Sequence, residues 1–156
     1  MAREEVPGLA FRGENEHNLD SKDRLTIPSR HRDQLADGLV LMKSLDACVA
    51  VYPAASFEGF TRRSLGDINP LGRRGRMMTR RLNARSHDDV LDSAGRVRIP
   101  QGLLDHAGLA GACTVIGVDD HLEIWDPERW AAEEAEIDEA AEELAEELAA
   151  ASDGNA

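Results

Sequence analysis

Two arginines occupy matching positions in two similar ten-residue segments. Residues 19–28 read LDSKDRLTIP and residues 91–100 read LDSAGRVRIP, which places Arg24 and Arg96 at the same position of each segment. A guanidinium donates two parallel hydrogen bonds in one plane, and this geometry fits a phosphate, a carboxylate or the O6 and N7 atoms of guanine. The recurrence makes Arg24 and Arg96 the first candidates for ligand-binding residues.

Each arginine also has an acidic neighbour that offers a purely local role. Asp20 and Asp92 lie four residues before Arg24 and Arg96, so an ion pair on the protein surface is the alternative to ligand binding. Taken singly, either segment favours that ion pair. The recurrence at matched positions, together with the family resemblance given below, favours ligand binding.

Other basic residues near these segments are candidates for contacts with phosphates. Lys22 and Arg98 lie close to the two arginines in the sequence. Arg12, Arg30 and Arg32 are weaker candidates for the same kind of contact. Contacts of this kind position a protein on DNA, whereas bonds to base edges give the preference for a sequence.

The similarity extends beyond the ten-residue segments and defines an internal repeat. The two segments are 72 residues apart, and the spacing then becomes 73, with the extra residue in the helix of the second copy. At this spacing three landmarks recur: Gly38 matches Gly111, Val51-Tyr52 matches Ile124-Trp125, and Phe57 matches Trp130. Landmarks that stay in register over so long a stretch indicate two copies of one structural unit.

Both copies predict the same order of elements. A short strand leads into a tight turn, a second strand, a short helix and a β-hairpin. Side chains alternate along the second strand, so Leu25, Ile27, Val97 and Ile99 are expected to face inward and Thr26 and Arg98 outward. The expected elements are residues 18–19, 25–27, 30–35, 39–42 and 48–52 in the first copy and residues 90–91, 97–99, 102–106, 113–118 and 121–125 in the second.

The residue types within the turns fit a tight backbone. Asp20 and Asp92 can accept a hydrogen bond from the backbone N–H two residues on, and Gly95 adopts a positive φ without steric cost. Asp23 takes the place of Gly95 in the first copy, and aspartate tolerates the left-handed conformation better than most residues. The proline that ends each segment stops the strand and suits the first turn of a helix.

The sequence therefore predicts an α+β fold of two tandem modules related by pseudo-twofold symmetry. A hairpin with one short helix cannot bury its apolar face alone, so the copies must interleave with one another or with other chains. We expect an N-terminal extension, a first module, an arginine-rich helical linker broken near Asn69-Pro70, a second module and a long acidic C-terminal helix. Their bounds are residues 1–10, 11–56, 57–86, 87–126 and 127–156.

The net charge of −12 is unevenly distributed. Residues 131–156 contain ten acidic residues and no basic one, whereas residues 62–85 contain eight arginines and a single acid. Asp126 is a good N-cap and Pro127 suits the first helical position, so a long helix is expected there, fraying from Ser152. The arginine cluster fits phosphates and the acidic helix of the same or a neighbouring subunit equally well. The acidic helix itself is more often a solvated surface than a mimic of DNA.

The sequence lacks the patterns of enzymes, metal sites and membrane proteins. Its five histidines have no metal-ligand spacing, and neither a Gly-x-x-x-x-Gly-Lys loop nor a Gly-x-Ser-x-Gly elbow is present. Cys48 and Cys113 lie in apolar stretches and are expected in the core. No segment approaches the ~18 apolar residues of a membrane span. We expect a cytoplasmic protein without catalysis, cofactor, metal or small-molecule substrate.

The paired Asp-Ser-x-x-Arg segments, each followed by hydrophobic-x-Ile-Pro, resemble the repeated signature of the MraZ family. The run Phe11-Arg12-Gly13-Glu14 resembles the N-terminus of that family, and Glu123-Ile124-Trp125-Asp126 with Trp130 resembles its C-terminal signature. The resemblance covers roughly residues 11–130. It implies two AbrB-like swapped-hairpin modules in one chain.

The resemblance also implies a function. Members of this family are cytoplasmic, nucleoid-associated transcriptional regulators that assemble into rings and bind short direct repeats upstream of a division and cell-wall gene cluster containing their own gene. Promoter DNA and further copies of the chain are then the partners, Arg24 and Arg96 the contact residues, and repression the expected outcome. Asp23 departs from the usual glycine and puts a carboxylate beside Arg24, which predicts weaker binding by the first copy.

Two alternatives remain open at this point. An antitoxin-like protein would bind DNA through its hairpins and mask a basic partner with its acidic helix, and it would lose order without that partner. A purely structural ring would show no preference among DNA sequences.

Overall fold

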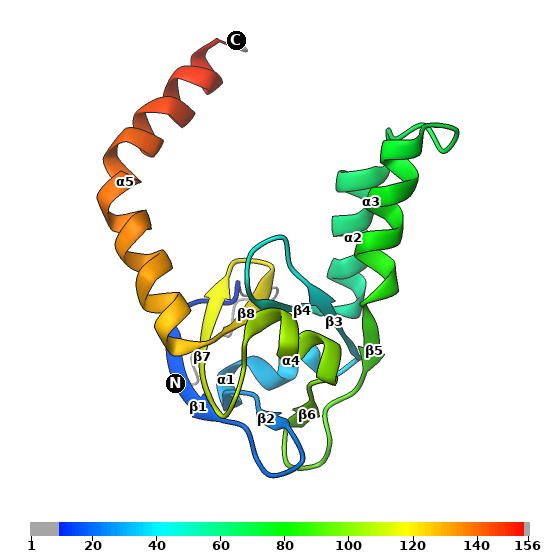
Figure 1. Cartoon of the computed structure of the whole chain (residues 1–156), viewed down its shortest axis with the longest axis vertical. Coiled ribbons are helices and arrows are strands. Elements are labelled where there is room, and N and C mark those ends of the chain that lie inside the picture. The colour runs from blue at the N-terminus through cyan, green and yellow to red at the C-terminus, as the bar shows by residue number, and fades with distance from the viewer. Residues whose placement is uncertain (1–9, 155–156) are drawn as a thin grey trace, which may run out of the picture. The chain divides into compact units, whose positions relative to one another are not determined.

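A computed structural model describes residues 10–154 of the chain (Figure 1). The chain divides into two compact units at the boundary between Asp126 and Pro127. The first unit contains every strand, and the second contains one long helix. The expected N-terminal extension lies outside the described residues, apart from Ala10.

The first unit has the order of elements that the repeat predicts. Its elements are β1 (Glu14–Asn18), β2 (Arg24–Thr26), α1 (Ser29–Arg32) with a 3₁₀ turn (Asp33–Leu35), β3 (Leu39–Lys43), β4 (Val49–Pro53), α2 (Ala54–Leu65), α3 (Arg73–Ala84), β5 (His87–Asp89), β6 (Arg96–Arg98), α4 (Gln101–Ala107), β7 (Ala112–Val118) and β8 (His121–Trp125). Both predicted hairpins and both short helices are confirmed, and the segment between the repeats forms two helices separated near Asn69-Pro70.

The strands show how the two copies interleave. Six of them form one antiparallel sheet in the order β1-β7-β8-β4-β3-β5, and β2 pairs with β6 in a separate two-stranded ribbon. Apart from the hairpins β3-β4 and β7-β8, every pairing joins one copy to the other. Equivalent strands of the two copies lie at equal distances from the two edges of this sheet: β1 and β5 at the edges, then β7 and β3, then β8 and β4 at the centre. The predicted α+β fold with pseudo-twofold symmetry is confirmed, and the copies interleave within one chain.

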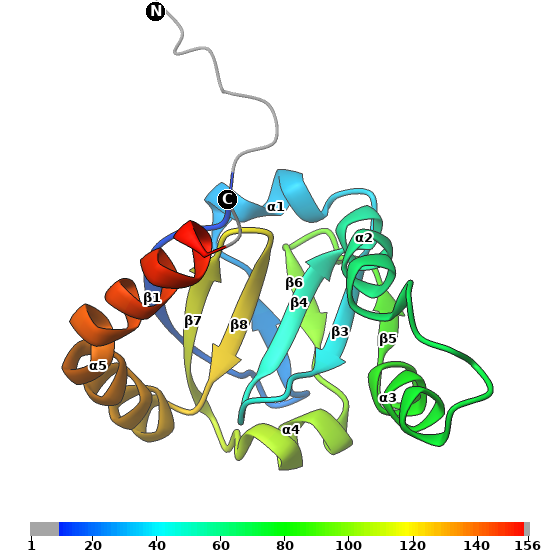
Figure 2. The same cartoon turned by 90° about the horizontal axis from the view of Figure 1, so that it is seen from above.

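The core follows from the alternation of side chains on the central strands. Residues of β3 and β4 are buried on both faces of the sheet, which explains their almost unbroken apolar sequences, LVLMK and VAVYP. On one face the sheet packs against the ribbon, α4 and the 3₁₀ turn; the fully buried side chains there include Leu25, Ile27, Val97, Ile99, Leu35 and Leu103. On the other face Met42, Ala50 and Tyr52 pack against the α2–α3 pair. Figure 2 shows the central strands side by side, with α1 and α4 at opposite ends of them.

The two cysteines confirm this placement of the core. Cys48 and Cys113 are buried and are not joined in a disulfide. Burial raises the pKa of the Cys113 thiol to about 11. Both residues act as small apolar side chains, as the sequence predicts.

The first strand of each copy is the element that the sequence placed wrongly. The sequence predicts strands at residues 18–19 and 90–91, whereas the strands are Glu14–Asn18 and His87–Asp89, so only Asn18 of the predicted residues lies in a strand. Both are edge strands of the sheet and consist of polar residues, so they lack the apolar alternation that identifies a half-buried strand. Leu19 and Leu91 follow the strands and pack against the core as single anchors.

The second unit is the helix α5 (Pro127–Asp153). It begins at the predicted Pro127, and Glu128 lies in its first turn, where a negative charge favours the positive end of the helix dipole. The helix includes Ser152 and Asp153, so the expected fraying at these two residues is wrong; Asn155 and Ala156 lie outside the described residues. Among the helices of residues 10–154, none is both long and apolar enough to cross a membrane.

A substitution at Gly117 tests the contact between the start of the described chain and the β7–β8 hairpin. A Cβ atom at this position would collide with the backbone of Phe11 and Arg12, where Phe11 bonds Asp119 in both directions at 2.7 and 3.0 Å. We expect Gly117→Ala to lower the free energy of unfolding by about 1–3 kcal/mol, because backbone cannot move aside cheaply. Gly111→Ala is the control, since no atom lies within 4 Å of its added Cβ. Equal denaturation midpoints for the two variants would contradict this packing.

A second test concerns His121, which lies between two carboxylates. Its Nδ1 lies 2.7 Å from Asp120 Oδ1 and its Nε2 lies 3.2 Å from Glu123 Oε2, while its ring stacks on Tyr52 at 4.5 Å between centroids. Burial alone would lower the pKa of His121, but the bonds to Glu123 and Asp120 outweigh it and the pKa is raised. The imidazolium therefore stabilises the fold fully below the unfolded pKa of about 6.5, and this stabilisation is lost as pH rises through the higher folded pKa.

We expect His121→Gln to reduce stability by on the order of 1 kcal/mol near pH 6 and by progressively less at alkaline pH. Urea denaturation of both proteins from pH 5.5 to pH 9 measures this difference. A difference that does not change with pH would mean that His121 acts only through packing.

Candidate nucleic-acid interface

The candidate residues gather on the ribbon formed by β2 and β6. In this antiparallel pair Arg24 lies opposite Arg98, Leu25 opposite Val97, and Thr26 opposite Arg96. Leu25 and Val97 are buried on the inner face, so the residues that alternate with them point outward. The ribbon therefore carries three arginines and one threonine on its outer face. The turns that precede β2 and β6 lie next to each other at the bottom of Figure 1, away from α2 and α3.

Backbone bonds join each turn to the opposite copy. The N–H of Ile27 donates to the carbonyl of Gly95 at 2.9 Å, and the N–H of Ile99 donates to the carbonyl of Asp23 at 2.9 Å. Asp23 has a φ of 58° and Gly95 a φ of 74°, so the first turn keeps the left-handed conformation without a glycine, as predicted. The two turns thus have the same backbone structure and support each other.

Each turn is closed by its aspartate in the predicted manner. Asp20 Oδ1 accepts the backbone N–H groups of Lys22 and Arg24 at 2.9 and 3.0 Å. Asp92 Oδ1 accepts those of Ala94 and Arg96 at 3.0 and 2.8 Å. Chiefly through the backbone N–H of Arg24, the pKa of Asp20 falls to about 2. The backbone N–H of Arg96 lowers the pKa of Asp92 in the same way.

The same aspartates hold the side chains of the two arginines. Arg24 Nε donates to Asp20 Oδ2 at 2.7 Å, and Arg96 Nε donates to Asp92 Oδ2 at 2.8 Å. The local ion pair that the sequence offered as an alternative is therefore present in both turns. It does not exclude ligand binding, because these two bonds use Nε, and the edge formed by the two terminal nitrogens is not part of either bond. The side chains of Arg24 and Arg96 remain 29% and 33% exposed.

The other predicted basic residues divide into two groups. Lys22 in the first turn and Arg98 opposite Arg24 are exposed and lie at the ribbon. Arg32 also belongs there, because its Nε donates to the carbonyl of Ile27 at 2.9 Å and its side chain lies against Gly95.

Arg12 and Arg30 are placed differently. Arg12 precedes β1, whose opposite end leads into the first turn, and its backbone lies beside the β7–β8 hairpin. Arg30 covers Gly13 near that same end of β1. The ribbon thus unites Lys22, Arg24, Arg96, Arg98 and Arg32, and it does not include Arg12.

The sequence did not reveal one contact of this site. Arg96 Nη1 also lies 3.9 Å from Asp20 Oδ2, which belongs to the other copy. The motif shows that each arginine has an aspartate four residues earlier, but only the pairing of β2 with β6 brings the first aspartate to the second arginine.

Several arginines of the linker bond other residues of the same chain. Arg81 donates to the carbonyls of Lys43 and Ser44 at 3.2 and 2.9 Å, and Arg63 pairs with Asp120 at 3.3 Å. Arg76 bonds the carbonyl of Leu71. Part of the predicted cationic cluster therefore stabilises the fold.

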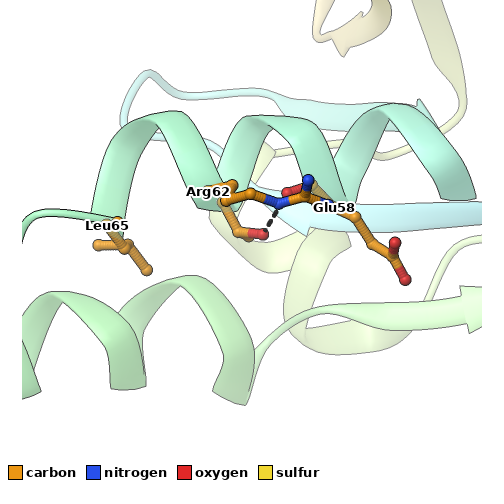
Figure 3. Close-up of a pocket in the computed structure, with 5 residues that line it drawn as sticks. Glu58, Arg62 and Leu65 are labelled. Carbon is orange, nitrogen blue, oxygen red and sulfur yellow. Dashed lines mark hydrogen bonds between the residues drawn. The ribbon is translucent and has the colours of Figure 1, made fainter.

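The hollow that the structure shows on α2 is open to solvent. This shallow hollow is lined by one helix and its C-terminal cap, as Figure 3 shows; its residues are Glu58, Thr61, Arg62, Leu65 and Gly66. A surface formed by a single helix cannot surround a small molecule. Among residues 10–154 no group of three or more metal-ligating side chains converges. The ribbon remains the best-defined candidate site.

Comparison with known proteins identifies one family across both copies of the repeat. The model of a family described as "MraZ protein, putative antitoxin-like" matches residues 10–74 and 84–152. The transcriptional regulator MraZ of Thermobifida fusca (strain YX) is 39% identical over 138 residues, which cover 88% of this chain and 96% of the relative. The transcriptional regulator MraZ of Limosilactobacillus fermentum (strain NBRC 3956 / LMG 18251) is 38% identical over 121 residues, which cover 78% and 84%. With both repeats matched and the interleaved fold in place, the chain belongs to the MraZ family.

Proposed function

We propose that this protein is a sequence-specific DNA-binding transcriptional regulator that acts through the β2–β6 ribbon. Relatives that share most of its length are named transcriptional regulators. The observation that carries the proposal is the outer face of the ribbon, where the matched arginines Arg24 and Arg96 are held in place and still partly exposed. The protein acts by binding alone, without catalysis, cofactor or small-molecule substrate.

A two-stranded ribbon is a form of structure that fits the major groove. A two-stranded β-ribbon enters a groove about 12 Å wide, where each base pair presents a distinct set of donors and acceptors. The terminal nitrogens of Arg24 and Arg96 bond O6 and N7 of guanine, which is worth about 1–3 kcal/mol of discrimination for each base. Lys22, Arg98 and Arg32 meet the flanking phosphates, and Arg12 meets phosphates farther along the duplex.

One ribbon recognises few bases, so assembly belongs to the proposal. Several ribbons in a homo-oligomeric ring would bind several direct repeats at once, and overall affinity would rise without any new contact. The DNA lies upstream of the protein's own gene within a division and cell-wall cluster, and binding there represses that cluster. The protein would accordingly be located in the cytoplasm, at the nucleoid.

An antitoxin-like role is the second candidate, since the matched family carries the description "putative antitoxin-like". In this role the acidic α5 helix would cover a basic partner protein while the ribbon binds DNA. Ten of the acidic residues and no basic one lie in residues 131–156, which suits such a partner.

DNA binding is tested by fluorescence anisotropy with a labelled duplex from upstream of the gene and a scrambled duplex, each at several salt concentrations. We expect Arg24→Ala and Arg96→Ala each to reduce the preference for the native duplex by about tenfold, because each removes a base contact. Lys22→Ala, Arg98→Ala and Arg12→Ala should weaken binding to both duplexes equally and reduce the salt dependence, as loss of phosphate contacts does. Equal affinity of the wild type for both duplexes would overturn the regulator.

The assembled state separates the two candidates. We expect the purified protein to unfold cooperatively without any partner, because the interleaved first unit has its own core. We also expect it to sediment as a single oligomer, as the proposed ring requires. Analytical ultracentrifugation and thermal melting measure both properties. A disordered monomer that gains order only with a basic partner protein would favour the antitoxin-like role instead.

A further inference from the structure

One carboxylate lies between the arginines of the two copies. Asp20 Oδ2 accepts Arg24 Nε at 2.7 Å and lies 3.9 Å from Arg96 Nη1. The first contact lies within one turn, whereas the second joins residues that are 76 positions apart in the sequence. Asp20 therefore accepts a hydrogen bond from one candidate base reader, Arg24, and lies within ion-pair distance of the other, Arg96.

The register of the ribbon explains why this contact forms. Thr26 lies opposite Arg96 and Arg24 lies opposite Arg98, so Arg24 and Arg96 are diagonal neighbours on one face. Diagonal neighbours in an antiparallel pair lie about 7–8 Å apart, within reach of long side chains. Both arginines point outward because Leu25 and Val97 occupy the inner face. Arg24 and Arg96 therefore form one cluster on the ribbon, and they do not lie at two separate sites.

Asp92 occupies the equivalent position but has a different set of contacts. Its Oδ2 accepts Arg96 Nε at 2.8 Å, and no ion pair between Asp92 and Arg24 is found among the described residues. The pseudo-twofold symmetry of the backbone is therefore broken by the side chains. Arg96 has a carboxylate from each copy, whereas Arg24 has one.

We propose that Asp20 is a positioning residue that couples Arg24 and Arg96 into a single base-reading unit, with Asp92 positioning Arg96 alone. This inference rests on the proposed function of the ribbon. A guanidinium that is already held in orientation loses less freedom when it binds a base. Loss of the Asp20 charge therefore loosens both arginines, and loss of the Asp92 charge loosens one.

Asparagine is the substitution that isolates this role. Asp20→Asn and Asp92→Asn each retain the Oδ1 atom that accepts the two backbone N–H groups of the turn. Each removes the negative charge of the carboxylate and the Oδ2 atom that accepts the arginine Nε. The two variants are matched in position, chemistry and turn structure. They differ in the arginines that they release.

The first measurement uses the protein without DNA. Exchange between the two Nη signals of each arginine in NMR spectra reports rotation about the Nε–Cζ bond. We expect Asp20→Asn to accelerate this rotation for both Arg24 and Arg96, and Asp92→Asn to accelerate it for Arg96 only. An unchanged rate for Arg96 in Asp20→Asn would overturn the proposal.

The second measurement is the ratio of affinities for the native and the scrambled duplex. We expect Asp20→Asn to reduce this ratio by about two- to tenfold in the Arg24→Ala background and by a similar factor in the Arg96→Ala background, because one arginine remains in each. Asp92→Asn should reduce the ratio only where Arg96 is present. Melting temperatures of all variants are measured alongside. A merely structural role of Asp20 would lower the melting temperature and weaken binding to both duplexes equally.

The outcomes separate this proposal from the proposed function. An effect of Asp20→Asn that disappears in the Arg24→Ala background would make Asp20 a local partner of Arg24 and overturn the coupling. Equal wild-type affinity for both duplexes would remove DNA recognition itself. In that case the rotation of Arg24 and Arg96 in the free protein still decides whether Asp20 joins them.

Discussion

The pairing of β2 with β6 joins the core of the protein to its candidate site. It spans three residue pairs and joins strands that belong to different copies of the repeat. Leu25 and Val97 on its inner face complete the main core, while its outer face presents the arginines. Fold and candidate site are therefore two faces of one ribbon. A change that separates the strands would remove both.

For the proposed binding of DNA, the charge of the ribbon matters more than the net charge of the whole chain. Aspartates in each turn hold the backbone through one oxygen and an arginine through the other. These carboxylates reduce the net positive charge at the surface, but they fix the direction of the guanidinium groups. A site built this way gains specificity from geometry and leaves much of the affinity to phosphate contacts and to assembly. The overall charge of −12 says little about it, because the acidic residues concentrate in α5.

The sequence predicted what depends on local chemistry and missed what depends on long-range pairing. The repeated motif predicted the Asp20 and Asp92 turns, the left-handed Asp23 and the inward residues of both strands, all of which follow from short-range rules. The strands β1 and β5 were misplaced because their residues are polar. The contact between Asp20 and Arg96 was missed because it depends on how distant strands pair. The distance of Arg12 from the turns also depends on the fold, because β1 lies between them.

In the proposed complex, arginines of one composite ribbon contact guanines in the major groove. Replacing single guanines of the native duplex with 7-deazaguanine removes the N7 acceptor and leaves base pairing intact, so the affinity for these duplexes reports whether an arginine bonds N7. We expect at least one replacement to weaken wild-type binding and to have no further effect on a variant that lacks Arg24 or Arg96. Wild-type binding that is unchanged by every replacement would contradict the proposed contact.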